Sequence, residues 1–253
     1  MTQIALHLIR NATLKLRFGG CTLLVDPYLV AQHEGKTYGG RLRSPLAPLP
    51  MPVADILNDV DAVFVSHLHS DHFDEAAKRL LPRELPVLCA APIADGIRAS
   101  GFAHVTVIDG GLHWSGTALE LTGGRHGPDE VLAEMGAVHG FIATCPDAPT
   151  LYWVGDSIWC PEVRAAIGRH RPNYIVVHAC GAAWKGVGPL VMDAHHVEAL
   201  LRHAPWATVV ATHMDCVDHA TVSRVQLAQH FRSLPALRRR LRIPADGETL
   251  VLG

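Results

Sequence analysis

The stretch that decides the fold of this 253-residue chain is residues 66–74, which read SHLHSDHFD. Four side chains that can bind a metal lie there within six positions: His67, His69, Asp71 and His72. Residues two apart in an extended segment point to the same side, so His67 and His69 can converge on one ion. Three imidazoles and a carboxylate are costly to bury without a shared cation. The stretch therefore predicts a metal site.

The flanking residues predict a bend at this site. Residues 62–65 (AVFV) form an apolar run that is typical of a buried strand, and residues 74–81 are expected to be helical. His72 would then leave the chain at a different angle from His67 and His69. One strand-to-helix bend can supply ligands to two adjacent metal positions.

Three further candidate ligands lie at or just beyond strand-like runs elsewhere in the chain. They are His126 in a glycine-rich turn, Asp156 and His213. Layered folds gather their ligand-binding groups at strand ends, so we expect these side chains to complete the site.

Strand-like and helix-like stretches alternate along the rest of the sequence. Strands are predicted over 13–18, 21–25, 86–91, 105–108, 119–122, 140–144, 151–154, 174–178 and 208–211. Helices are predicted over 92–100, 160–170, 193–203 and 221–233. Residues 28–54 are rich in glycine and proline, so we expect an ordered loop near the site. This mixture predicts an α/β layered architecture, and without repeats or a linker we expect a single domain over 1–253.

Composition limits the function. With 49% hydrophobic and 18% charged residues, a full core is feasible, and a net charge of −2 argues against a surface that coats nucleic acid. Six widely spaced cysteines indicate buried thiols rather than a disulfide framework. We see neither a signal peptide nor an apolar run of ~18 residues, and therefore expect a cytoplasmic protein without a membrane span. The basic run at 238–242 is expected to be a solvated helix face.

The ordered ligands resemble those of the metallo-β-lactamase-fold hydrolases. The matching positions are His67-x-His69-x-Asp71-His72, then His126, Asp156 and His213. Within that superfamily the chain is most similar to small bacterial hydrolases near the ascorbate-phosphate lactonases. The resemblance implies a four-layer αββα sandwich of two mixed β-sheets flanked by helices.

The resemblance also implies a division of roles. His67, His69 and His126 would hold one divalent metal, and Asp71, His72 and His213 a second, with Asp156 bridging them. Zinc is the first expectation, with manganese or iron as alternatives. A metal-bridged hydroxide would then attack a small ester, lactone or phosphodiester. Asp71 could also accept a hydrogen bond from this nucleophile, and Asp26 would orient a ligand histidine.

Two alternatives stay open on the same scaffold. They are a mono-iron oxidoreductase of the dioxygenase type and a catalytically silent metal-binding protein. Members with oxygen-reducing di-iron chemistry resemble a pattern with Glu at the position of His69, which favours hydrolysis here. The expected partner is a small-molecule substrate, without nucleic acid or membrane, and homo-oligomerisation is left open.

Several other residues are secondary candidates. His219 could hydrogen-bond the substrate or donate a proton to the leaving group, or be a surface residue. His178 could line the pocket. Asp193 is expected to be a helix N-cap, and Cys180 and Cys216 to be bystanders. Three cationic side chains could neutralise an anionic substrate: Arg10, Arg125 and Lys185.

Overall fold

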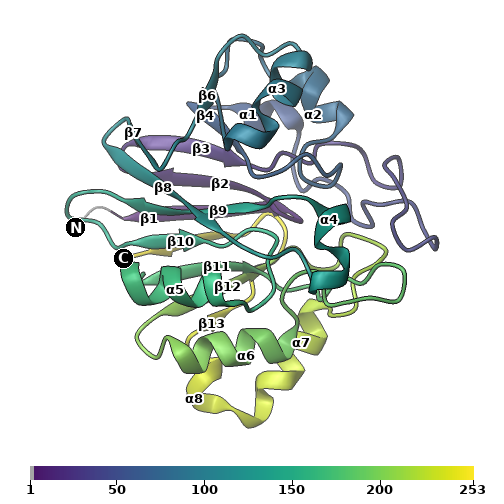
Figure 1. The fold of residues 1–253 in the computed structure, drawn as a ribbon, viewed down its shortest axis with the longest axis vertical. Coiled ribbons are helices and arrows are strands. Elements are labelled where there is room, and N and C mark those ends of the chain that lie inside the picture. The colour runs from purple at the N-terminus through teal and green to yellow at the C-terminus, as the bar shows by residue number, and fades with distance from the viewer. Residues whose placement is uncertain (1–2) are drawn as a thin grey trace.

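The structure is a computed structural model that describes residues 3–253. In that part of the chain, two seven-stranded sheets pack face to face and helices cover both outer faces (Figure 1). The first sheet has the order β14-β1-β2-β3-β4-β5-β6, and the second has the order β13-β12-β11-β10-β9-β8-β7. The predicted four-layer α/β sandwich of two mixed sheets is confirmed.

The strand bounds are as follows. The first sheet contains β1 (Ile4–Arg10), β2 (Thr13–Phe18), β3 (Cys21–Val25), β4 (Ala62–Val65), β5 (Val87–Cys89), β6 (Val105–Val107) and β14 (Thr249–Leu252). The second contains β7 (Gly111–Trp114), β8 (Thr117–Gly123), β9 (His139–Thr144), β10 (Leu151–Trp153), β11 (Tyr174–His178), β12 (Thr208–Thr212) and β13 (Leu241–Arg242).

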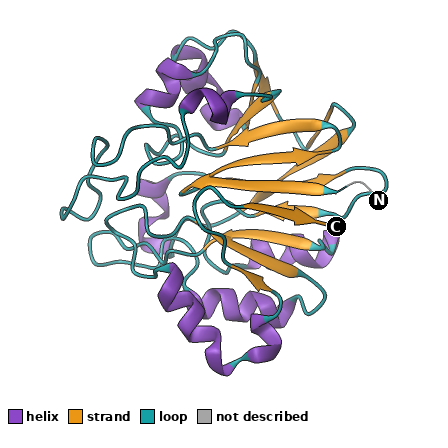
Figure 2. Ribbon diagram, turned by 180° about the vertical axis from the view of Figure 1, so that it is seen from behind, coloured by secondary structure: helices purple, strands orange, loops and turns teal. Residues whose placement is uncertain are grey.

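Strand direction brings the candidate ligands together. In the first sheet β14, β1, β2 and β3 pair antiparallel, whereas β3 to β6 pair parallel. The second sheet repeats this pattern, antiparallel from β7 to β10 and parallel from β10 to β13. The strands β3, β4, β8, β10, β11 and β12 therefore all end at one edge. Figure 2 shows the long loops at that edge and the C-terminus at the opposite one.

The core lies between the sheets and under each helical layer. Phe64, Phe141 and Trp153 are fully buried between the sheets, with the Phe64 and Phe141 ring centroids 4.9 Å apart. Alternate residues of the same strands, such as Val63 and Tyr152, face the helices instead. Because both faces of each sheet are covered, these strands read as continuous apolar runs.

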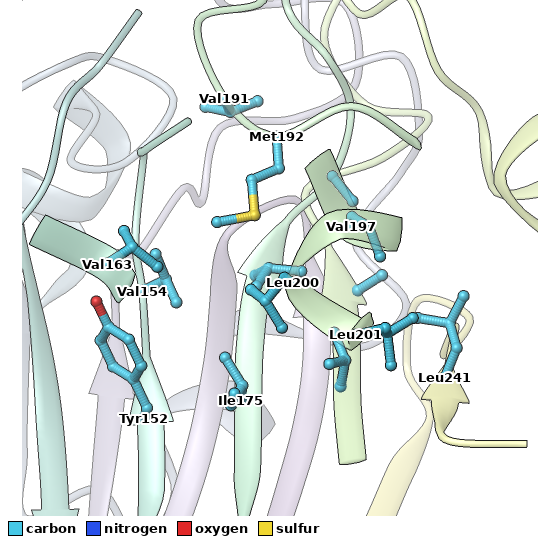
Figure 3. Close-up of a cluster of buried hydrophobic side chains, with 14 of the residues drawn as sticks. Tyr152, Val154, Val163, Ile175, Val191, Met192, Val197, Leu200, Leu201 and Leu241 are labelled. Carbon is cyan, nitrogen blue, oxygen red and sulfur yellow. The ribbon is translucent and has the colours of Figure 1, made fainter. Parts of the chain in front are cut away.

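The helices form the two outer layers. The bounds are α1 (Val53–Leu57), α2 (Glu75–Leu80), α3 (Ala91–Ala99), α4 (Leu132–Met135), α5 (Pro161–His170), α6 (Ala194–His203), α7 (Arg224–His230) and α8 (Pro235–Arg238), with 3-10 turns at Asp129–Val131 and Phe231–Ser233. The first three cover the first sheet, and α5 to α8 cover the second. Figure 3 shows Tyr152 and Ile175 of the second sheet beneath Val163, Leu200 and Leu201.

Side-chain caps explain where two helices begin. The Asp193 carboxylate accepts the N–H of His196, so Asp193 is the N-cap of α6 as predicted. The last predicted helix begins at Arg224 rather than residue 221, because Ser223 and Gln226 form a capping box there.

The basic run at 238–242 is solvated as predicted at Arg238, Arg239 and Arg242, although only Arg238 lies in a helix, and Arg240 is half-buried. Arg240 donates hydrogen bonds to the carbonyl oxygens of Leu201, Ala204 and Ala207. Its guanidinium therefore satisfies acceptors left open at the end of α6. Among residues 3–253, no helix is long and apolar enough to cross a bilayer.

Candidate metal centre

Asp26, at the end of β3, fixes both ends of the ligand-bearing segment that leaves β4. Its carboxylate accepts the Ser66 N–H at 2.8 Å, the Ser66 hydroxyl at 2.7 Å and the His72 Nδ1–H at 2.7 Å. Because the Ser66 hydroxyl donates to Asp26, it accepts the Nδ1–H of His67 at 2.9 Å. These bonds leave the Nε2 atoms of both His67 and His72 facing the Asp156 carboxylate.

The first group of donor atoms comes from His67, His69 and His126. One nitrogen from each of these rings lies within 4.8 Å of the others. His126 Nε2 is 3.3 Å from His69 Nδ1, while His126 Nδ1 donates to the Leu190 carbonyl oxygen at 3.0 Å. The turn after β8 thus carries an imidazole across to the segment after β4.

The second group consists of Asp71, His72 and His213. His213 Nε2 lies 3.2 Å from His72 Nε2 and 3.4 Å from Asp71 Oδ2, which is itself 3.8 Å from His72 Nε2. The Asn11 amide supports this group by donating to the backbone oxygen of Asp71 at 3.0 Å.

Asp156 lies between the two groups. Its Oδ2 atom is 3.2 Å from His72 Nε2, 3.3 Å from His126 Nε2 and 3.7 Å from His67 Nε2. Its Oδ1 atom is 3.9 Å from His213 Nε2. All seven sequence-predicted ligands therefore lie in one cluster, with His69 beside His126 and Asp71 beside His213.

His178 lies behind Asp156 rather than on the pocket wall. The imidazole is fully buried, and its Nδ1–H donates to Asp156 Oδ1 at 2.5 Å. Cys180 is also closer to the site than expected, with its Sγ atom 3.5 Å from His213 Nδ1. Both residues hold ligands from behind, in roles that their position at a strand end did not reveal.

Burial and opposite charges determine the protonation of the cluster. Burial lowers the pKa values of His67 and His69 below the usual range for histidine, and it lowers the pKa of His178 to about 4. These three rings are therefore neutral at pH 7. Burial also opposes the charged form of His72, but Asp156, Asp26 and Asp71 outweigh it and raise its pKa to about 10. The pKa of Asp156 is lowered despite burial, chiefly by His72 and His126.

The residues fit a divalent metal. His67 Nε2 is buried without a hydrogen-bond partner, and it faces the same point as the Nε2 atoms of His72 and His126. Neutral imidazoles together with carboxylates suit zinc, manganese or iron. The expectation of two divalent ions, with these ligands, remains a prediction.

A pocket of about 380 Å³ opens onto the cluster. His69, Asp71, His126, Asp156 and His213 form its floor. Its walls are formed by Lys36, Tyr38, Leu68, Ser70, Glu134, Met135, Ala182, Trp184, Leu190, Val191 and His219. His219 is thus on the pocket, with its ring centroid 5.0 Å from that of Tyr38. The predicted loop over 28–54 does reach the site, through Lys36 and Tyr38.

The three cationic candidates are engaged elsewhere. Arg10 is fully buried and donates to the carbonyl oxygens of Tyr28, Val30 and Ala47. Arg125 pairs with Glu162 and Asp129, and Lys185 with Glu134 at 3.1 Å. The expectation that Arg10 neutralises a substrate was therefore wrong, whereas for Arg125 and Lys185, which do not line the pocket, it stays a prediction.

Comparison with known proteins agrees with this geometry. Residues 22–214 match the beta-lactamase superfamily domain, a span that contains every predicted ligand. The chain belongs to the beta-lactamase superfamily. The resemblance stated from the ligand pattern is therefore confirmed.

Several similar proteins match this chain over nearly its whole length. The UPF0173 protein YddR of Bacillus subtilis (strain 168) is 34% identical over 247 residues, which cover 95% of this chain and 97% of the relative. The crystal structure of a possible metal-dependent hydrolase from Veillonella parvula DSM 2008 has a TM-score of 0.94, with 33% identity and complete coverage of both chains. The crystal structure of an isothiocyanate hydrolase from Delia radicum gut bacteria has a TM-score of 0.93 and is 32% identical. The match covers 97% of this chain and 98% of the hydrolase chain. The predicted enzyme class, a metal-dependent hydrolase of this fold, is confirmed at the level of the family.

Proposed function

We propose that the chain is a dinuclear metal-dependent hydrolase that acts on small uncharged electrophiles, with esters and lactones as the first candidates. One observation carries the proposal: the Asp156 carboxylate stands between two groups of donor atoms, each with at least three members. A mono-iron enzyme would load only one of these groups, so the number of bound ions distinguishes the two alternatives.

The residues have distinct roles in this proposal. His67, His69 and His126 would hold one ion, Asp71, His72 and His213 the other, and Asp156 would bridge them. When bound, the ions would lower the pKa of a water molecule and polarise the substrate. Asp71 stays ionised because His72 and His213 outweigh its burial and keep its pKa low, and its carboxylate can accept a hydrogen bond from the attacking water.

His219 is the candidate hydrogen-bond donor to the leaving group. It lines the pocket outside both donor groups, and burial lowers the pKa of its imidazole. Its Nδ1 atom is buried without a partner, so the ring is free to carry its proton on Nε2. A neutral imidazole with Nε2–H could donate a hydrogen bond to a departing alkoxide, whose proton comes from the attacking water.

The pocket walls favour uncharged substrates over phosphodiesters. Leu68, Met135, Trp184 and Val191 supply apolar surface, and Lys36 stands among them as an exposed cation. Beyond the charge of the bound ions, the walls add Lys36 for a phosphodiester, whereas the nearby Lys185 is paired with Glu134.

An isothiocyanate is the second candidate substrate. The neighbour named isothiocyanate hydrolase shares 32% of its residues over nearly the whole chain. Addition of water to R–N=C=S gives a thiocarbamic acid, which releases carbonyl sulfide and leaves an amine. This linear, uncharged group with an apolar substituent would suit the walls described above.

The test is a substrate panel on protein stripped by a chelator and reloaded with Zn²⁺, Mn²⁺ or Fe²⁺. The panel contains a γ-lactone, 4-nitrophenyl acetate, a thioester, a β-lactam, bis(4-nitrophenyl) phosphate and benzyl isothiocyanate. We expect turnover only after reloading, with the highest kcat/KM on an uncharged substrate, and a loss of at least about 100-fold in His126→Ala.

A matched control separates the site from adventitious metal. His195, Glu198 and His230 form another group whose donor atoms lie within 4.8 Å, on the helical surface. His230→Ala should therefore retain turnover. Absence of hydrolysis across the reloaded panel would refute the proposed function, and iron-dependent oxygen uptake with a thiol substrate would select the mono-iron alternative.

A further inference from the structure

Tyr38 places a hydroxyl group on the pocket wall beside the ligand-bearing segment. Its Oη atom lies 2.7 Å from Ser70 Oγ, and Ser70 stands between the predicted ligands His69 and Asp71. On its other side the phenol ring packs against His219, with ring centroids 5.0 Å apart. Tyr38 therefore contacts both segments that carry ligands of the second group.

A single carboxylate holds the loop that presents Tyr38. Asp218 Oδ1 accepts the backbone N–H groups of Tyr38 at 2.8 Å and Gly39 at 2.9 Å. Asp218 Oδ2 accepts the Thr37 hydroxyl at 2.7 Å and the Arg41 N–H at 3.1 Å. Asp218 is only 4% exposed, so these bonds replace water around a buried charge.

The two arms of the loop are joined by backbone bonds, from Gly35 N–H to the Ser44 oxygen and from Ser44 N–H to the Lys36 oxygen, both at 2.8 Å, whereas the donors at its tip go to Asp218. Residues 28–52 contain no helix or strand, and Lys36, Thr37 and Gly39 are exposed. Gly39 approaches so closely that a Cβ atom there would lie 2.9 Å from the Asp218 carbonyl oxygen. Asp218 thus holds the backbone at Tyr38, while Ser70 and His219 contact its side chain.

The chemistry of the phenol suits a hydrogen-bond donor to a ligand. If the Ser70 hydroxyl donates to Tyr38 Oη, the phenolic proton is left for a molecule in the pocket. Burial raises the pKa of Tyr38, so the hydroxyl keeps its proton at neutral pH.

We propose that Tyr38 donates a hydrogen bond to the substrate atom that becomes negative during hydrolysis, and that Asp218 is the positioning residue that holds it there. This inference rests on the proposed function and adds a residue to it. The accepting atom would be the carbonyl oxygen of an ester or lactone, or the terminal sulfur of an isothiocyanate. The proton remains on Tyr38 throughout, so Tyr38 is a donor and not an acid.

The test is a double-mutant cycle on metal-loaded protein, with the best substrate of the panel. Tyr38→Phe keeps the ring against His219 and should lower kcat about 100-fold with little change in KM, as for other donors to a developing charge. Asp218→Asn should lower kcat about 10-fold alone and less than about 2-fold in the Tyr38→Phe background, because it acts through Tyr38.

A control variant and a second measurement test whether the losses in kcat have this cause. Tyr174→Phe removes another tyrosine hydroxyl, from the first residue of β11, and should leave kcat unchanged. Amide hydrogen exchange at residues 38, 39 and 41 should accelerate in Asp218→Asn but not in Tyr38→Phe, which shows whether the loop has been released.

The outcomes are distinct. An unchanged kcat in Tyr38→Phe, with an active wild type, would overturn the donor role alone. Additive losses in the double variant would overturn the positioning role of Asp218. A wild type that turns over no member of the panel would instead refute the proposed function, and this inference with it.

Discussion

Asp26 controls the ligand-bearing segment without lying on the pocket. Its carboxylate accepts the Nδ1–H of His72 directly and reaches Nδ1 of His67 through the Ser66 hydroxyl, which fixes the orientation of both rings. In both rings the Nε2 atom is thereby left to face the Asp156 carboxylate. Residues that orient a ligand in this way contribute to metal affinity although they do not touch the metal.

We predict that Asp26→Asn weakens metal binding about 10- to 100-fold, because an amide cannot accept all three hydrogen bonds at once. Competition with a chromophoric chelator measures this affinity. Asp193→Asn is the matched control, since Asn also caps a helix well, and its affinity should equal that of the wild type. An affinity within about 2-fold of wild type in Asp26→Asn would contradict this role.

Asp218 makes the pocket loop sensitive to acid. Burial opposes its charged form, but the N–H and hydroxyl donors of residues 37–41 outweigh burial and hold its pKa below the usual range. The stabilisation is therefore complete above the unfolded pKa of about 3.9 and is lost as the pH falls through the lower, folded pKa.

We predict that limited proteolysis in the loop at 36–44 is slow and constant from pH 7 down to about pH 4, and accelerates below it. In Asp218→Asn, cleavage should be fast, because the amide has only one acceptor oxygen for these donors. The rate should also stay constant with pH, because the amide does not titrate. A wild-type loop whose cleavage rate already changes between pH 7 and pH 5 would argue against Asp218 as the cause.

Among single residues, the metal ligands could be predicted from the sequence, whereas the residues of the pocket wall could not. His67, His69, Asp71 and His72 stand in one short segment, so local spacing identifies them. Tyr38 lies in a loop without hydrophobic periodicity, and Asp218 reaches it across 180 residues of sequence. No local pattern encodes such a contact.

Strands were predictable where the sequence alternates regularly, as in β2, or is almost continuously apolar, as in β4. β2, β3, β4 and β11 have the predicted bounds. β1 was not predicted, although its sequence alternates, because His7 and Arg10 interrupt the apolar pattern of IALHLIR. Arg10 is nevertheless fully buried, since backbone carbonyl oxygens surround its guanidinium.

The edge strands β14 and β13 were missed for a different reason. β14 is only four residues long, with Val251 63% exposed, and β13 has two residues. Each becomes a strand only because a longer neighbour, β1 or β12, supplies hydrogen bonds. Pairing of this kind is set by the tertiary fold rather than by local propensity.

The capping box of α7 provides a test at the scale of the element. Ser223 accepts the Gln226 N–H at 3.1 Å while the Gln226 side chain accepts the Ser223 N–H at 2.8 Å. We predict that Ser223→Ala lowers the free energy of unfolding by about 1 kcal/mol. Ser233→Ala, an exposed serine without such a role, should change it by less than about 0.5 kcal/mol in the same urea titration. Equal effects of the two variants would exclude a capping contribution.

The stability of the whole molecule depends on the contact between the two sheets. Phe141 is fully buried there, with its ring centroid 4.9 Å from that of Phe64 and 5.5 Å from that of Trp153. We predict that Phe141→Ala costs about 3–5 kcal/mol, because it removes a large side chain and leaves a cavity between the sheets. Urea unfolding measures the loss, with the exposed Val251→Ala as control. A cost below about 1 kcal/mol would contradict this packing.

The other properties expected of the whole molecule stay predictions. They are a single domain, a cytoplasmic location, the absence of nucleic-acid partners, and the identity and number of the metals. Of these, the number of metals bears most directly on function, because two ions around Asp156 distinguish the proposed hydrolase from a mono-iron enzyme.

Anomalous diffraction from crystals of zinc-loaded protein, with data collected on both sides of the zinc absorption edge, tests this point most directly. We predict two peaks in the pocket floor on either side of the Asp156 carboxylate, one beside His67, His69 and His126 and the other beside Asp71, His72 and His213. A single peak, or none at these residues, would contradict a dinuclear centre.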